Sequence, residues 1–290
     1  MSDLQETVVV NKPKGNPLSN YFRQPKIFLK LPSGGRFYPE GTLDSSSTGE
    51  YPVYAMTAKD ELILKTPDAL LNGQATVELI KSCVPSIRDP WRMPSIDIDA
   101  VLMAIRVATY GKDMEVSASC PACNHQNDYV FDIVQYLGKL QSFNFESQIE
   151  VGPLKINIRP YDYKEGTKAA IKAIEQQRIF TTVTDETMSD EEKLEKFGRS
   201  FVKLTELTVD VVCGCITSIE TPEGTVNDQT MIQEFINNTT SEIFNTINDH
   251  VMKMKDQIEL KTQQVACDEC KHDYEINITM DQSNFFAVRS

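Results

Sequence analysis

The sequence predicts an α+β protein: a mixed helical body with short antiparallel strands and a ribbon-like four-cysteine subdomain whose two halves are far apart in sequence. Several segments repeat apolar residues at helical spacing, and short runs such as Ile27–Leu31 have the composition of strands. Two Cys-x-x-Cys pairs, at 120–123 and 267–270, each precede a strand-like run. With 290 residues, 40% of them hydrophobic, the chain can bury a sizeable core.

Charge and hydropathy exclude several classes of partner. The chain has 42 acidic against 29 basic residues, a formal net charge of −13, which repels phosphate backbones and anionic lipid surfaces. No apolar run reaches the roughly 20 residues of a membrane helix, and the first residues lack the apolar centre of a secretory signal. We therefore expect a cytosolic protein that binds neither nucleic acid nor membrane.

The chain divides into five predicted regions. In order, they are a flexible N-terminal arm, an N-terminal α+β region, a ribbon-like module in two segments, a mostly helical insertion and a C-terminal tail: 1–25, 26–111, 112–138 plus 264–281, 139–263 and 282–290. The arm is polar and buries little, so we expect it to order only on a partner.

Local signals place the helices of the N-terminal region. Thr57 is positioned to cap a helix, and Asn72-Gly73 precedes a second helix over 74–83. A third helix is expected to follow Asp97 and to end at Gly111.

The insertion has elements of its own. Alternating residues around Gly152-Pro153 predict a hairpin over 149–158. Four helices follow in the prediction, over 162–180, 191–207, 228–238 and 241–258. In the second of these, Phe197, Phe201 and Leu204 stand at core spacing.

The two cysteine pairs have the pattern of a zinc ribbon. Each is a Cys-x-x-Cys turn leading into a strand, in which two thiolates converge on one ion. Two such halves complete a closed tetrahedral shell for one structural zinc, so the predicted ligands are Cys120, Cys123, Cys267 and Cys270. Between Cys123 and Cys267 lie 143 residues. The insertion must therefore begin and end close together.

Other readings of the cysteines and histidines are weaker. A redox Cys-x-x-Cys pair requires a helix at its first cysteine, whereas Pro121 and a strand follow here. His125 or His272, each two residues past a pair, could replace a cysteine as ligand, and surface or supporting roles are the simpler alternative. Cys213 and Cys215 lie in an apolar run and are interpreted as buried thiols.

The sequence offers no catalytic motif. It has no phosphate-binding glycine loop, no dinucleotide fingerprint, no His-Glu-x-x-His and no nucleophile elbow. Two of its three histidines stand beside the cysteine pairs, and His250 is expected to be a solvated residue on a helix. We therefore predict that the protein is not an enzyme and has no small-molecule substrate. The remaining alternative, catalysis by a pair of acidic residues, is not supported by any motif.

A set of segments resembles the baseplate hub and hub-assembly proteins of T-even-like contractile-tailed bacteriophages. The resemblance extends over about residues 27–280. It is carried by Leu31–Tyr38, Met56–Glu61, Leu70–Gly73 and Ile105–Gly111 ahead of Cys120–Cys123.

The resemblance implies a non-enzymatic protein of the virion tail baseplate, made in the host cytoplasm. It implies other baseplate hub or tail proteins as partners, and a place in the central hub as a permanent subunit or an assembly factor. Candidate contact residues, for which core packing is the alternative, are Phe28, Phe37, Tyr38 and Trp91. The C-terminal Phe285–Val288 is a further candidate for an external anchor. The competing hypothesis is a zinc-ribbon module that binds nucleic acid or protein outside any tail.

Overall fold

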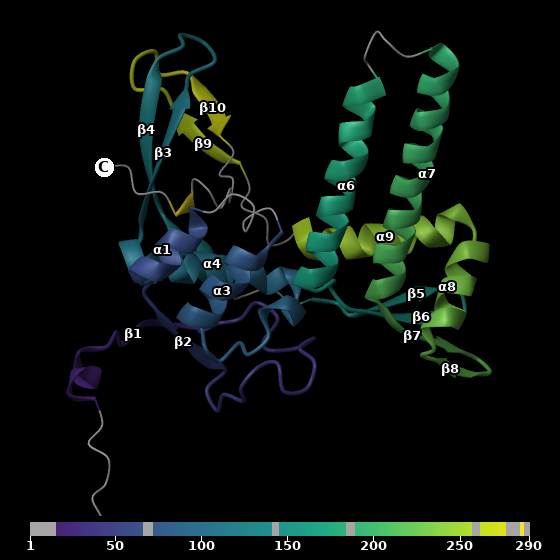
Figure 1. Ribbon diagram of the computed structural model, residues 1–290, viewed down its shortest axis with the longest axis horizontal. Coiled ribbons are helices and arrows are strands. Elements are labelled where there is room, and N and C mark those ends of the chain that lie inside the picture. The colour runs from purple at the N-terminus through teal and green to yellow at the C-terminus, as the bar shows by residue number, and fades with distance from the viewer. Residues whose placement is uncertain are drawn as a thin grey trace, which may run out of the picture.

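The computed structural model describes residues 16–65, 72–140, 145–183, 189–256, 262–276 and 285–286. Two bodies lie side by side, and two small hairpins rise from the first body (Figure 1). The α+β prediction is confirmed. Predictions for residues 1–15, 70–71, 184–188, 257–258, 277–284 and 287–290 fall outside the described residues.

In its described residues, the N-terminal body combines one antiparallel strand pair with three α-helices. Its elements are η1 (Pro17–Tyr21), β1 (Pro25–Lys30), β2 (Glu50–Tyr54), α1 (Ala58–Leu64), α3 (Gln74–Cys83), η2 (Pro90–Arg92) and α4 (Ser95–Tyr110). Thr57 caps α1 as predicted, because its hydroxyl and the Asp60 carboxylate bond each other's backbone N–H groups. Helix α4 begins two residues before Asp97, after Pro94, and ends at Gly111.

Helix α4 lies at the centre of this body and is buried almost all round. Val101, Leu102 and Ile105 are at most 2% exposed, and the helix contacts both strands, α3 and a further helix, α5 (Ile133–Leu140). Asp97 is also fully buried. Its carboxylate accepts hydrogen bonds from the backbone N–H of Ser33 at 2.8 Å and from its hydroxyl at 2.6 Å.

Burial of Asp97 predicts a pH-dependent stability. Desolvation raises the pKa of Asp97 from 3.8 to about 6, although both Ser33 hydrogen bonds act in the opposite direction. The folded state therefore holds this proton more tightly than the unfolded state. Its contribution is complete below pH 3.8 and is lost as the pH rises through about 6, by about 3 kcal/mol in all.

The measurement compares the free energy of unfolding of the wild type and Asp97→Asn from pH 4 to pH 7.5. The wild type should lose about 2.5 kcal/mol relative to the variant over this range, because asparagine does not ionise and a small part of the effect is already lost at pH 4. The hydrogen bond lost to Ser33 adds an offset that does not change with pH. Parallel curves for the two proteins would contradict the prediction.

Two aromatic residues from the far end of the chain complete the core of the N-terminal body. Phe285 and Phe286 are 5% and 7% exposed, and their rings meet edge to face with centroids 5.1 Å apart. Arg106 of α4 donates to the carbonyl oxygen of Phe285 at 2.9 Å and stacks over its ring. The prediction that these aromatics form an external anchor is therefore wrong.

The insertion builds a second core on a four-stranded antiparallel sheet of order β5-β6-β7-β8. Its elements are β5 (Gln148–Val151), β6 (Leu154–Ile158), α6 (Tyr163–Val183), α7 (Asp190–Cys215), β7 (Ile216–Thr221), β8 (Gly224–Val226), α8 (Gln229–Asn238) and α9 (Ser241–Asp256). The hairpin predicted at Gly152-Pro153 is β5–β6. Helices α6 and α7 stand side by side, and α9 crosses near their base (Figure 1). In the described residues no helix is long and apolar enough to cross a membrane.

Helix α7 differs from its prediction in length and in burial. It continues through Val209–Cys215, eight residues beyond the predicted end, because Val212 and Cys215 pack into the core of the insertion. Phe197 and Phe201 are 48% and 62% exposed, so they are not the core residues that their spacing predicts. Helix α6 lies beside this part of α7, whereas α8 and α9 lie near the other end of the helix (Figure 1).

In the described residues the two bodies meet around Pro94 and Asp162, and α4 also contacts α6 and α9. The backbone of Pro94 pairs with that of Asp162 in an isolated antiparallel bridge, with hydrogen bonds on either side. Trp91 stacks on Tyr163 with ring centroids 5.6 Å apart, and Arg92 pairs with the buried Asp162 at 3.0 Å. Trp91 therefore serves internal packing, whereas Phe28, on β1, is 64% exposed. Phe37 and Tyr38 pack partly buried against the first core.

Candidate metal centre

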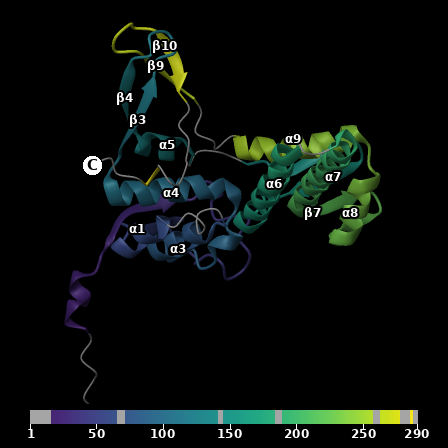
Figure 2. The same ribbon diagram turned by 45° about the horizontal axis from the view of Figure 1, so that its top comes forward.

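Two hairpins carry the four predicted ligands. The first is β3 (Asp113–Ser119) with β4 (Gln126–Asp132), and the second is β9 (Gln263–Ala266) with β10 (Asp273–Ile276). They lie side by side above the N-terminal body in both views (Figures 1 and 2). Each Cys-x-x-Cys forms the turn of its hairpin. Strand β4 ends at Asp132, and helix α5 begins at the next residue, Ile133.

The two turns have the same backbone hydrogen bonds. In the first, the N–H of Cys120 donates to the carbonyl of His125 at 2.9 Å, and the N–H of Asn124 donates to the carbonyl of Cys120 at 2.9 Å. Cys267 makes the same pair of bonds with His272 and Lys271, at 2.9 and 3.0 Å.

Each turn passes through one residue in the left-handed conformation. These are Asn124, at φ 58°, and Lys271, at φ 59°, each directly after a second cysteine. Asparagine tolerates this conformation well, while lysine does so at a cost that the rest of the turn must offset. The left-handed residue reverses the chain and brings both sulfurs of a pair to one side.

The four sulfur atoms fit a tetrahedral zinc ion. All of them lie within 4.8 Å of one another, Cys120 Sγ is 3.7 Å from Cys270 Sγ, and Cys123 Sγ is 3.6 Å from Cys267 Sγ. Zn–S bonds of about 2.3 Å in a tetrahedron place sulfurs about 3.8 Å apart. The cluster joins segments separated by 143 residues, as the sequence predicted.

Donors around the sulfur of Cys267 favour its thiolate form. Burial opposes ionisation of Cys267, but N–H groups of Cys270, Glu269 and the Asn127 side chain point to its sulfur and lower its thiol pKa to about 6. The pKa of Cys123 moves the other way, to about 12; the backbone at His125 lowers it, but hydrogen bonds with the other sulfurs outweigh this. One thiol thus donates to a neighbouring thiolate, and a cation would replace that proton.

The histidines that could have served as ligands stand outside the cluster. His125 and His272 are exposed, and in the described residues the group able to hold a metal consists of the four cysteines. The ring of His272 instead stacks on Tyr274, with centroids 6.5 Å apart. The two turns use the backbone carbonyls of these histidines.

The remaining cysteines and His250 lie elsewhere. Cys83, Cys213 and Cys215 are buried, as interpreted for the last two, and burial raises the pKa of Cys215 to about 12. His250 is half-buried rather than freely solvated, because its Nε2 lies 2.8 Å from the carbonyl oxygen of Glu146. That bond ties α9 to the segment before β5.

A polar network that sequence reasoning missed joins the two hairpins. Asn127 reaches across to Cys267 and Asp268, and the hydroxyls of Tyr129 and Tyr274 lie 3.1 Å apart. Tyr129 also donates to the carbonyl of Ala266 at 3.0 Å. An asparagine where strand β4 begins was the available signal, but its partners lie about 140 residues away.

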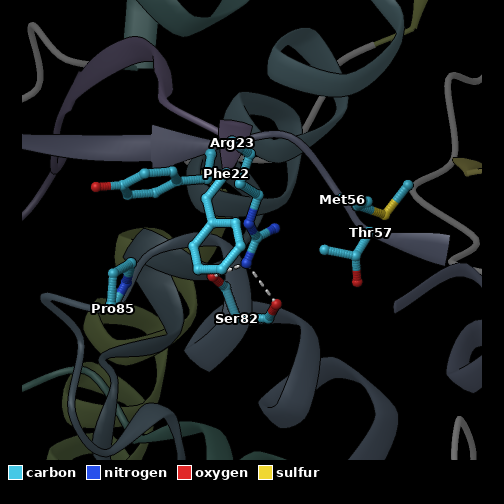
Figure 3. Close-up of a pocket in the computed structure, with 7 residues that line it drawn as sticks. Phe22, Arg23, Met56, Thr57, Ser82 and Pro85 are labelled. Carbon is cyan, nitrogen blue, oxygen red and sulfur yellow. Dashed lines mark hydrogen bonds between the residues drawn. The ribbon is translucent and has the colours of Figure 1, made fainter. Parts of the chain in front are cut away.

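A separate cavity of about 510 Å³ lies at the base of the arm (Figure 3). Its lining is mostly apolar and consists of Phe22, Arg23, Tyr54, Met56, Thr57, Ser82 and Pro85. The guanidinium of Arg23 donates to the carbonyl and hydroxyl oxygens of Ser82 at 2.6 and 2.8 Å and lies 3.5 Å from Asp60. This cationic side chain therefore anchors the arm to the body.

Comparison with known proteins identifies the family of this chain. The chain belongs to the family described as T4 bacteriophage base plate protein, whose sequence model matches residues 24–287, nearly the whole chain. This family membership places the protein in the baseplate of a phage tail, among other baseplate or tail proteins, and suggests a structural rather than an enzymatic role. No curated protein and no solved structure matches the chain.

Proposed function

We propose that this protein is a non-enzymatic structural or assembly component of the central hub of the baseplate, stabilised by one structural zinc ion per chain. Membership of the baseplate family over residues 24–287 is the observation that carries the proposal. The segments named above resemble hub and hub-assembly proteins in particular, which supports the hub over the rest of the baseplate.

The zinc part of the proposal is supported by the four converging sulfurs. The proposed ligands are Cys120, Cys123, Cys267 and Cys270, whose spacing suits a Zn–S₄ shell. Four thiolates would fill the shell and leave no position for a substrate or a reactive water. The ion would bind the two hairpins to each other.

We further propose that the chain works as a ribbon that closes the base of an insertion. In this division 112–138 and 264–281 form the ribbon, 139–263 the insertion, 26–111 the N-terminal region, 1–25 a partner-dependent arm and 282–290 a tail. The separate cores of the first body and of the insertion support it. The net charge of −13 favours protein partners over nucleic acid.

A quantitative mass-spectrometric inventory tests the assignment to the hub. Purified virions, isolated baseplates and assembly intermediates would be compared for peptides of this chain. Fixed copy numbers in virions and baseplates would support a permanent subunit, and presence in intermediates alone would support an assembly factor. Absence from all three, together with no binding to purified hub proteins, would overturn the proposal.

A further inference from the structure

Asn127 is a buried polar side chain in contact with both halves of the metal centre. It lies in β4 and is 2% exposed. Its Nδ2 donates to the carbonyl of His125 at 3.1 Å and lies 3.6 Å from the sulfur of Cys267. Its Oδ1 accepts the backbone N–H of Asp268 at 2.8 Å. One amide thus fixes its own turn and engages the other turn twice.

Each contact to the second turn has a distinct physical effect. The bond from Asp268 gives a backbone donor of the second turn a partner on the first hairpin, and so holds the second turn in register. The donor to Cys267 stabilises negative charge on a metal-binding sulfur. Four thiolates around one dication carry excess negative charge, so a donor aimed at one sulfur favours the loaded site.

The second hairpin has no asparagine at the position that corresponds to Asn127. Asn127 stands seven residues after Cys120, and the residue seven after Cys267 is Tyr274. The Tyr274 hydroxyl lies 3.4 Å from Nδ2 of Asn127 and 3.5 Å from the carbonyl of Ala118. The Tyr274 hydroxyl therefore supports the asparagine, and the side-chain amide contact to the Cys267 sulfur comes from the first hairpin.

We infer that Asn127 is a positioning residue of the metal centre, which docks the second Cys-x-x-Cys turn on the first and donates to the Cys267 sulfur. This inference rests on the proposed zinc function. Removal of such a supporting hydrogen bond typically weakens metal affinity about 10- to 100-fold.

Two variants of the full-length chain separate the two contacts. Asn127→Ala removes both the acceptor for the Asp268 N–H and the donor to the Cys267 sulfur. Asn127→Asp keeps an oxygen that can accept the Asp268 N–H, but it replaces the donor to sulfur with a negative charge. Asn157→Ala is the matched control, because Asn157 is a half-buried asparagine that bonds Ser218 and Glu220 on the distant sheet.

Zinc affinity is measured by chelator competition, and Co²⁺ loading gives the thiolate-to-cobalt charge-transfer band. We expect zinc binding to be 10- to 100-fold weaker in both Asn127 variants, and Asn127→Asp to bind no more tightly than Asn127→Ala. The control Asn157→Ala should keep the affinity of the wild type. The charge-transfer band should shift to lower energy without the donor. Iodoacetamide should also alkylate Cys267 of the zinc-loaded variants several-fold faster, as peptide mass spectrometry reports.

Each outcome is decisive. One outcome would refute the sulfur contact and show that Asn127 only holds the backbone of the second turn. In that outcome Asn127→Ala binds zinc weakly, whereas Asn127→Asp has the zinc affinity, the charge-transfer band and the alkylation rate of the wild type. Wild-type values in both variants would refute the whole inference. If Ala does not fold, the Asp variant alone decides the sulfur contact. A wild-type chain that binds no zinc would instead refute the proposed metal centre.

Discussion

Cys270→Ser is expected to abolish stoichiometric zinc binding and to lower the free energy of unfolding by about 4 kcal/mol or more. Serine does not supply a thiolate, so the shell keeps three sulfurs and the ion loses its closed tetrahedron. The stabilisation from a ligand present at about 1,000 times its dissociation constant is about 4 kcal/mol, and it disappears with the ligand. Cys270 is exposed, so the exchange itself leaves little cavity.

Elemental analysis and denaturant unfolding with and without a chelator measure this effect. The wild type should carry about one zinc per chain and lose stability when a chelator is added. The variant should carry no stoichiometric zinc, and its stability should not change with the chelator. Cys213→Ala is the control, since Cys213 is buried in the core of the insertion, and it should retain full zinc. Full zinc occupancy after all four cysteines are replaced by serine would show that the ligands are wrong.

Phe285→Ala is expected to destabilise the protein by about 3–5 kcal/mol. The ring is 5% exposed in the first core, so its removal leaves a cavity that the packed neighbours fill only partly. The substitution also takes away the aromatic face over which the guanidinium of Arg106 lies.

Denaturant unfolding of zinc-loaded protein measures this loss. Phe28→Ala is the matched control, because that ring is 64% exposed and its loss should cost less than about 0.5 kcal/mol. Equal and small losses in the two variants would show that the C-terminal aromatics do not belong to the core.

Local chemistry in the sequence predicted much of the fold. The Thr57 cap, the turn at Gly152 and the helix end at Gly111 involve residues within a few positions of one another. The cysteine pairs are the exception, because their shared spacing revealed a contact across 143 residues.

The features that escaped prediction depend on distant partners. Whether Phe201 is buried depends on which elements reach that part of α7, and spacing along one helix contains no such information. The β-branched run 209–215 is helical because it packs against the core of the insertion, which outweighs its weak helix propensity. Asn127 is functional only through partners in the last tenth of the chain.

The split ribbon also determines when the fold can be completed. Ribosomes add about 5–20 residues per second, so Cys120 and Cys123 emerge roughly 7–30 s before Cys267. During that interval the four-cysteine cluster has only two of its sulfurs, and the first core lacks Phe285 and Phe286. A chain that terminates before Cys267 can complete neither the four-cysteine cluster nor the first core. We therefore expect truncated products to be cleared by proteolysis before they can compete for places in a growing baseplate.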